Sequence, residues 1–540
     1  MAEGLAILTG VAALLAAASA MRAQRDAFAP PVVFGPMLIY CYAFLPAVVL
    51  AGGAASAYLT AEEATKVCLL NLAGVAAFLA GAWPRGLRRG DTRGIHNLQM
   101  RLTDAARRRL TLLGLLMGAV AVGAFCYNVN YTGGWLKVFS RGKPYVSSPT
   151  GYLGEMPMVA FPAALLFSLG HSARRLTLGR VLAVLFILFP HVVMATLGGR
   201  RGPAFYTFGT LALCGYLITA RRPSWSALMA GLAAVGLTML FLVSNRANLG
   251  VGQENVVDVD AFWNAVVPAE VDGNHEFVFS AGMMNSADYH KEYGWGVRYF
   301  ALLFVRPIPK QVWPTKYEDL GLGWMVNNPG MGNFEDFEWE EAVGFVPSRG
   351  TAGGFITDMY VEFSWLAVAP VFLIGALYSK SYQLSRRRGG VWTLVYIELL
   401  VLSVHLPAQS VQSWLYRGIL LVGVTLVAWR ALMGRSAWDA RGRASPPVGG
   451  GPPTWDRPTP VDETAGEGEL PPESRDEAPT VRLTAAGELP FEDAGPDGPE
   501  DPVRRTGAAP WPPREARRGE SPKPRTVGRP IPMLDPGEAT

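Results

Sequence analysis

The sequence predicts an all-α polytopic membrane protein. Of its 540 residues, 50% are hydrophobic and only 17% are charged, whereas soluble proteins carry nearer a quarter of charged residues. The hydrophobic residues come in blocks of about 20, the length at which a helix crosses the hydrocarbon core of a bilayer. Such segments must satisfy their own backbone hydrogen bonds, which selects helices, and the alternating pattern of a membrane barrel is absent.

About eleven membrane-spanning helices are predicted. The first ends in "ASA", as a cleavable signal would, but no charged segment precedes it, so a retained helix is predicted. The cysteines have no metal-ligand spacing and are interpreted as small apolar core residues; they are Cys41, Cys68, Cys126 and Cys214. The predicted spans are 4–21, 31–52, 65–83, 109–128, 153–170, 177–197, 202–220, 225–244, 352–378, 391–407 and 413–433.

Basic loops orient these spans, because cytoplasmic loops carry an excess of Lys and Arg. Segment 83–110 is strongly basic and is predicted to be cytoplasmic. Alternation from this loop puts the first residue outside and the C-terminus inside. One turn breaks the rule, because Arg200 and Arg201 in "GGRRG" then face outward. The other basic clusters all fall inside: Arg22, Arg25, Arg174, Arg175, Arg180, Arg221, Arg222, Arg386, Arg387, Arg388, Arg430 and Arg435.

The chain divides into four parts. Residues 1–244 hold eight spans, 245–351 form a large outer loop, and 352–433 hold three more spans. Within the loop, "GWGVRYFALLFV" is expected at the membrane interface or partway into the bilayer. Residues 434–540 contain about half of the 41 prolines and few large aliphatic residues. This composition cannot bury a core and predicts a disordered cytoplasmic tail.

Outward-facing cations beside the spans are the clearest chemical signal. Guanidinium groups bind phosphates through paired hydrogen bonds and stay charged in poorly solvated sites. The alternative for any one of them is anchoring to lipid phosphates. Aromatic residues crowd the same outer loop and fit either sugar rings or the membrane interface. The outward-facing cations are Arg200, Arg201, Arg246, Arg298, Arg306, Lys310, Lys316, Arg349 and Arg417.

Three titratable residues near the outer face are set apart from the solvated acids of the loop. Asp358 and Glu362 fall inside the ninth span, where acids are costly and point to an interior role. His405, at the outer end of the tenth span, fits a general base or a ligand of a diphosphate, and a structural histidine fits equally. No nucleotide-binding loop, dinucleotide fingerprint or HExxH is present. ATP coupling, a metal cofactor and nucleic-acid binding are therefore not expected.

Two motifs resemble Wzy-type polymerases of O-antigen and exopolysaccharide repeat units. "FVRPIPKQVWPTKYEDLG" (304–321) is similar to a Pro-basic and Trp-Pro-Lys element of that family's large outer loop. "GGFITDMYVEFSWLAVAP" (353–370) is similar to the start of the next span, with Asp358 at the acid, Phe363 at the aromatic and Ser364 in place of the usual glycine. The "GGRRG" turn also resembles a small-residue and Arg turn of the family. The resemblance covers about 190–420.

The resemblance implies a fold and a reaction. The fold is a GT-C-like membrane glycosyltransferase in the bacterial inner membrane. The reaction transfers a growing glycan from undecaprenyl pyrophosphate to a hydroxyl of an incoming lipid-linked repeat unit, without a metal or other cofactor. The partners are lipid-linked glycans, membrane lipids and a chain-length regulator of the Wzz type. Asp358 or His405 would orient or deprotonate the acceptor hydroxyl. The implied diphosphate ligands are Arg200, Arg201, Arg246, Arg298, Arg306 and Lys310.

Rival functions stay open. An O-antigen ligase would use the same donor with a lipid A-core acceptor. A lipid-linked oligosaccharide flippase would need cations along a central cavity, whereas here the cations gather at the outer mouth. A non-catalytic assembly scaffold, served by the 434–540 tail, is the fourth reading.

Overall fold

The computed structural model describes residues 1–433 with gaps. The gaps are 86–101, 141–145, 147, 149–150, 173, 199–200, 310, 323–335 and 347–352, and only scattered residues are described between 220 and 274. The eighth predicted span, much of the outer loop and the predicted tail therefore lie outside the described residues.

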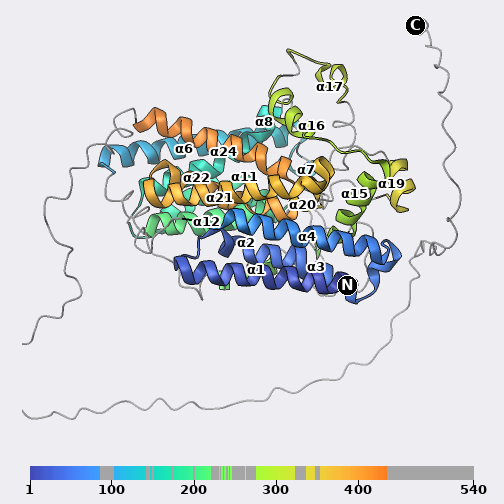
Figure 1. The fold of residues 1–540 in the computed structure, drawn as a ribbon. Coiled ribbons are helices and arrows are strands. Elements are labelled where there is room, and N and C mark those ends of the chain that lie inside the picture. The colour runs from blue at the N-terminus through green and yellow to red at the C-terminus, as the bar shows by residue number, and fades with distance from the viewer. Residues whose placement is uncertain are drawn as a thin grey trace, which may run out of the picture. The chain divides into compact units, whose positions relative to one another are not determined.

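The described residues are helical throughout (Figure 1). The α-helices are α1 Ala2–Gln24, α2 Pro30–Ile39, α3 Leu45–Ala51, α4 Ala61–Ala82, α6 Asp104–Tyr131, α7 Trp135–Phe139, α8 Gly151–Glu155, α9 Ala160–Gly170, α10 Leu178–Ile187, α11 Phe189–Thr196, α12 Arg201–Thr219, α15 Glu276–His290, α16 Val297–Phe300, α17 Lys316–Asp319, α19 Asp336–Val343, α20 Gly354–Phe363, α21 Val368–Arg388, α22 Val391–Leu402, α23 His405–Ala408 and α24 Val411–Met433. Short 3₁₀ or π segments are η1 Tyr40–Phe44, η2 Ala54–Ala57, η3 Met156–Val159, η4 Ala301–Val305 and η5 Ser364–Ala367.

Among the described residues, seven helical runs are long and apolar enough to cross a membrane, which confirms a polytopic membrane protein. Three predicted spans take other forms. The sixth is the pair α10 and α11, bent by 75°. The seventh is helix α12, which is not among these seven runs, and the tenth is a shorter apolar run, Val391–Pro407. The total of eleven stays a prediction. The seven runs are Ala2–Gln24, Pro30–Ala51, Ala61–Ala82, Asp104–Tyr131, Tyr152–Gly170, Gly354–Arg388 and Val411–Leu432.

Contacts at the two ends of the bundle agree with the predicted alternation. At the end predicted to be cytoplasmic, Arg386 Nη1 lies 2.6 Å from Asp26 Oδ2, and the Ser379 hydroxyl donates to the Trp83 carbonyl at 2.9 Å. At the opposite end, α15 contacts α4, and Figure 1 shows α15 and α19 toward the same end of the bundle as the chain's N-terminus. Each contact joins helix ends that the sequence places on the same side of a membrane. Which end faces the cytoplasm stays a prediction.

Helices α4 and α21 pack with their backbones in near contact. A Cβ added at Gly81 would lie 2.1 Å from the Phe372 carbonyl oxygen, and one at Gly375 would lie 2.2 Å from the Phe78 carbonyl oxygen. Glycine lets membrane helices approach closely, where van der Waals packing drives association. This pair therefore aligns α21 firmly against α4.

The helical run from Gly354 to Arg388 folds back on itself. The Phe355 ring lies 5.5 Å from the Phe78 ring, while Gly375 packs on the same Phe78. In a straight helix residues 355 and 375 would be about 30 Å apart. The reversal occurs at Ser364, whose φ of 51° is left-handed.

Helix α20 is consequently a half-helix in the outer part of the bundle. Ile356 lies against Gly74 of α4. Tyr360 lies beside Lys66, which is eight residues nearer the start of α4 than Gly74. Helix α20 therefore runs antiparallel to α4, and α21 alone carries the transmembrane path. This corrects the predicted ninth span, 352–378: Asp358 and Glu362 belong to the half-helix.

Gly81→Ala should destabilise the protein by about 1–3 kcal/mol or more, because its Cβ would overlap backbone atoms of α21 that cannot move alone. Thermal unfolding in detergent, followed by size-exclusion chromatography, measures this. Gly123→Ala on α6, where a Cβ meets nothing within 4 Å, is the matched control and should be neutral. Equal unfolding temperatures for the two variants would contradict the close packing.

Candidate functional site

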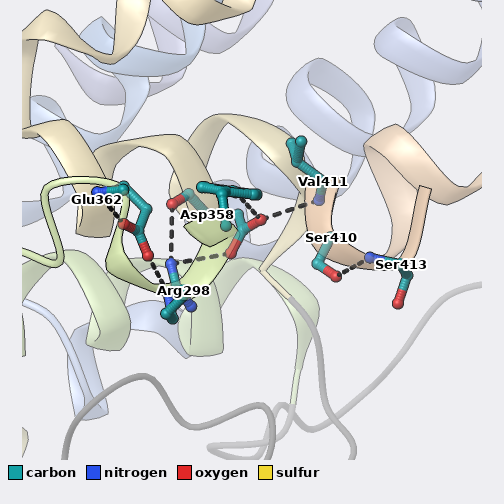
Figure 2. A network of polar contacts seen from close by, with 8 residues as sticks. Arg298, Asp358, Glu362, Ser410, Val411 and Ser413 are labelled. Carbon is teal, nitrogen blue, oxygen red and sulfur yellow. Dashed lines mark hydrogen bonds and ion pairs between the residues drawn. The ribbon is translucent and has the colours of Figure 1, made fainter. Parts of the chain in front are cut away.

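A buried ion-pair network joins α16 to α20 (Figure 2). Arg298 is 6% exposed, and its Nη2 lies 3.1 Å from Asp358 Oδ1. Its Nε forms a second ion pair with Glu362, which is fully buried. Glu362 also accepts a hydrogen bond from the Gly296 amide at 2.7 Å. Each charge in this network thus has a partner, which is what makes its burial tolerable.

Asp358 extends the network to α24. Its Oδ2 accepts hydrogen bonds from the Tyr299 hydroxyl at 2.7 Å and from the Val411 amide at 2.9 Å. Both carboxylate oxygens are therefore engaged by protein groups. The predicted catalytic role of Asp358 stays a prediction, but its partners fit a residue that holds α16, α20 and the start of α24 together.

A second cluster lies on α23 and α24. Arg417 Nη1 is 3.0 Å from His405 Nε2 and donates to Gln409 Oε1 at 3.4 Å. His405 is 1% exposed. The same Nη1 of Arg417 lies 3.3 Å from His405 Nδ1, so the guanidinium lies beside both ring nitrogens. A guanidinium only donates hydrogen bonds, and a permanent cation at this distance favours the neutral form of the imidazole.

Arg417 differs from the other interior arginines in its charge balance. Among the described residues, no carboxylate lies within 4.0 Å of its guanidinium. A cation inside a helical bundle without an acid beside it attracts an anion strongly, since the surroundings screen it poorly. The cluster of Arg417, His405 and Gln409 is therefore the best-placed anion site among the described residues.

The amino end of α12 lies next to this cluster. A Cβ at Gly202 would be 3.7 Å from Gln409 Nε2 and 3.8 Å from His405 Cε1. The Tyr206 ring, one turn on, lies 4.6 Å from the His405 ring. The first amides of a helix and its dipole favour negative charge. Gly202, the last residue of "GGRRG", therefore lies at the cluster. Arg201 begins α12 and its side chain is not described, and Arg200 lies outside the described residues.

The remaining predicted diphosphate ligands are distributed differently. Arg306 pairs with Glu155 at 3.3 Å and stacks over Tyr416, 4.1 Å from the ring centroid. Tyr416 precedes Arg417, so Arg306 lies near the cluster. Arg298 belongs to the buried network. Arg246 and Lys310 lie outside the described residues.

Lys316, one of the outward-facing cations of the sequence, is instead buried. Its ammonium donates to the carbonyls of Val305 at 2.8 Å and Arg306 at 3.2 Å, and also to that of Ile308. It therefore closes the carboxyl end of η4. Three residues on, Asp319 accepts from Trp313 Nε1 at 2.6 Å and Thr315 Oγ1 at 2.8 Å, and these donors hold the pKa of Asp319 below its usual value. Trp313, Thr315 and Lys316 of the Trp-Pro-Thr-Lys motif thus make hydrogen bonds that fix the conformation of this loop.

The sequence analysis assigned neither Gln409 nor Arg417 to the site, although Arg417 is one of the outward-facing cations. The segment "SVHLPAQSVQSWLYR" places Gln409 four residues after His405 and Arg417 eight further on. The break between α23 and α24 turns these positions toward one another. In the sequence, Arg417 lies among apolar residues and resembles any cation at a membrane interface. In the structure, its contacts with His405 and Gln409 distinguish it.

Within the described ranges, no group of three or more His, Cys, Asp or Glu side chains is arranged to hold a metal ion. The chemistry available at the cluster is therefore that of a guanidinium, a neutral imidazole, an amide and a helix amino end.

Fold and site together define an all-helical, polytopic membrane protein with a cationic cluster inside its bundle. No family model, curated protein or solved structure matches this chain.

Arg298→Ala should destabilise the protein by about 3–5 kcal/mol, because it leaves two buried carboxylates without their cation. Arg306→Ala, which removes a half-exposed pair of the same loop, should cost at most about 1 kcal/mol. Thermal unfolding of both variants in the same detergent compares them. Equal losses would show that the network is not a structural junction.

Proposed function

We propose that this chain polymerises undecaprenyl-pyrophosphate-linked oligosaccharide repeat units into O-antigen or exopolysaccharide at the outer face of a bacterial inner membrane. The observation that carries the proposal is Arg417, a bundle cation without a described carboxylate partner, beside His405, Gln409 and the start of α12. Its placement at the end of the bundle predicted to face outward supports an extracytoplasmic reaction.

The donor's diphosphate would occupy the cluster. Arg417 would bind it through paired N–H groups, and the amino end of α12 would add backbone donors. Arg200 and Arg201, in the same turn, are proposed as further ligands. Arg246, Arg306 and Lys310 are proposed to assist at the outer mouth. Arg298 would act from the buried network, by holding the loop that carries Arg306.

The proposed step is a glycosyl transfer. The bond between the donor sugar's anomeric carbon and the diphosphate oxygen breaks, and a bond from that carbon to the acceptor hydroxyl oxygen forms. The hydroxyl proton passes to the neutral imidazole of His405, and undecaprenyl pyrophosphate leaves as the anion. Preorganised cations stabilise the charge that develops on this leaving group. Holding both lipid-linked substrates in one site supplies proximity.

Asp358 and His405 would have separate tasks in this scheme. His405 is the proposed base, because a neutral imidazole can accept a proton and His405 lies beside the proposed leaving-group site. Asp358 is proposed to position α23 and α24 through its bond to the Val411 amide.

A chain-length regulator is proposed as a partner of this protein. The 434–540 segment is proposed to be a cytoplasmic extension.

A ligase that transfers the same donor to lipid A-core is the second candidate, since the same diphosphate site would serve it. A flippase is the third, and a non-catalytic assembly scaffold the fourth. The charge balance favours the enzymes: Arg386, at the end predicted to be cytoplasmic, is paired with Asp26, whereas Arg417 has no described carboxylate within 4.0 Å.

The test is a deletion strain, analysed for lipid-linked and surface glycans on a gel. A polymerase predicts a single accumulated repeat unit and no ladder. A normal ladder retained on the carrier lipid would indicate a ligase, and absence of repeat units from the outer leaflet a flippase. An unchanged profile would overturn the proposal.

Arg417→Ala should lower polymer by about 10²-fold or more at normal protein level, as expected when a donor to a developing oxyanion is lost. Arg417→Lys keeps the charge but not the paired geometry, so its polymer yield should lie between those of the wild type and Arg417→Ala. The readout is the ladder in the complemented deletion strain, with immunoblotting for protein level.

Arg430→Ala is the matched control, because Arg430 is an exposed arginine near the other end of the same helix α24. It should complement fully. A full-length ladder from Arg417→Ala would overturn the assignment of the cluster, whatever the deletion strain shows. Alanine at Arg200 and Arg201 should reproduce the loss.

A further inference from the structure

A row of four aromatic rings lies where the loop after α15 meets α20 and η5. Trp295 packs edge-on against Tyr293 at 6.2 Å, Tyr293 against Tyr360 at 6.2 Å, and Tyr360 against Trp365 at 5.9 Å between ring centroids. Edge-to-face contacts of this kind are favourable and fix the rings relative to one another. The four rings therefore form one continuous surface feature.

The two tryptophans at the ends of the row are exposed. Trp295 is 61% exposed and Trp365 is 46% exposed, whereas Tyr360 is 1% exposed. Tyr360 is buried and Tyr293 is partly exposed; the two tyrosines support the row, and the indoles extend from it. Exposed indoles occur both at membrane interfaces and at binding sites, so the surroundings of the row distinguish the two roles.

A charged pair lies under the centre of the row. Asp288 accepts hydrogen bonds from the hydroxyls of Tyr293 at 2.6 Å and Tyr360 at 2.8 Å. Lys66 of α4 forms an ion pair with Asp288, and its ammonium lies 5.5 Å from the centre of the Tyr360 ring. Both charged side chains are partly exposed. Donors and acceptors of hydrogen bonds thus lie beside the aromatic faces.

Trp295 is held in a strained backbone conformation. Its φ of 45° is left-handed, which costs free energy for a residue with a bulky side chain. The Trp295 amide donates to the Glu362 carbonyl at 2.8 Å, and the next amide donates to the Glu362 carboxylate. The buried pair of Arg298 and Glu362 therefore maintains the turn that projects this indole. Strain that is fixed in this way points to a functional position.

We propose that the row Trp295–Tyr293–Tyr360–Trp365 is a saccharide-binding platform for the glycan of the lipid-linked substrate. The platform rests on the proposed function for the origin of that glycan. The apolar C–H face of a pyranose ring stacks on an exposed indole, and its hydroxyls bond to the partly exposed Lys66, which Asp288 holds in place. A simple anchor in the membrane interface requires neither a strained, immobilised turn nor a charged pair under the rings.

The experiment measures binding of a lipid-free glycan to the full-length protein in nanodiscs. The probe is the oligosaccharide pool released by mild acid from the host's total lipid-linked glycans, fluorescently labelled at the reducing end. Trp295→Ala should weaken binding by about tenfold, and Trp295→Phe, which keeps an aromatic face, by much less. Trp365→Ala should weaken it too. Phe304→Ala, at a nearby aromatic residue that is 63% exposed and outside the row, should leave binding unchanged.

Unchanged binding by Trp295→Ala would overturn the platform, as would a wild-type protein that binds no oligosaccharide. A lower unfolding temperature of Trp295→Ala in nanodiscs, with intact glycan binding, would assign the row to membrane anchoring and overturn the platform as well. Size-exclusion profiles and unfolding temperatures of the variants establish that they fold. The polymerase proposal fails separately: a normal ladder in the deletion strain, with glycan binding that depends on Trp295, would keep the platform and overturn the polymerase.

Discussion

The burial of Arg298 between Asp358 and Glu362 is the interaction on which the outer half of the molecule depends. Removing charges from water is costly unless each finds a partner of opposite sign and the remaining hydrogen bonds are made. Here the guanidinium pairs with both acids, and the acids also accept bonds from Tyr299, Gly296 and Val411. One ionic junction therefore fixes three segments that are far apart in the sequence.

The half-helix α20 transmits this junction to the proposed site. Its first amide, at Gly354, donates to the Gln409 carbonyl at 3.0 Å, and Asp358 holds the amide of Val411. These two bonds bracket the break between α23 and α24. That break turns His405 and Gln409 toward Arg417. Helix α20 packs on α4, which α21 also contacts closely. The geometry of the cluster therefore follows from helix packing and one buried network.

Three arginines near the same end of the bundle illustrate how surroundings decide a residue's role. Arg298 is neutralised by two acids and serves structure. Arg306 has one partly exposed partner, Glu155, so its charge is largely screened by solvent. Arg417 faces His405 and Gln409, and no described carboxylate lies within 4.0 Å of it, although the charge of Glu155 acts on it from farther away. The charge of the residue is the same in each case, and the difference lies in the distance to carboxylates and in exposure to solvent.

The sequence by itself determined the class of the protein, most of its spans and the grouping of the basic loops, because hydropathy and charge act locally along a chain that must cross lipid. It also singled out Asp358, Glu362 and His405 as unusual, and it named Arg298 among the outward-facing cations. It did not reveal that 354–388 folds back at Ser364, that Lys316 is a buried cap, or that Arg417 belongs with His405. Those outcomes depend on contacts between residues that are separated by 8 positions, for Lys316 and Ile308, up to 277 positions, for Phe78 and Phe355. Only the tertiary structure decides them, because pairing a charge or reversing a helix is settled by which distant groups come within hydrogen-bonding distance.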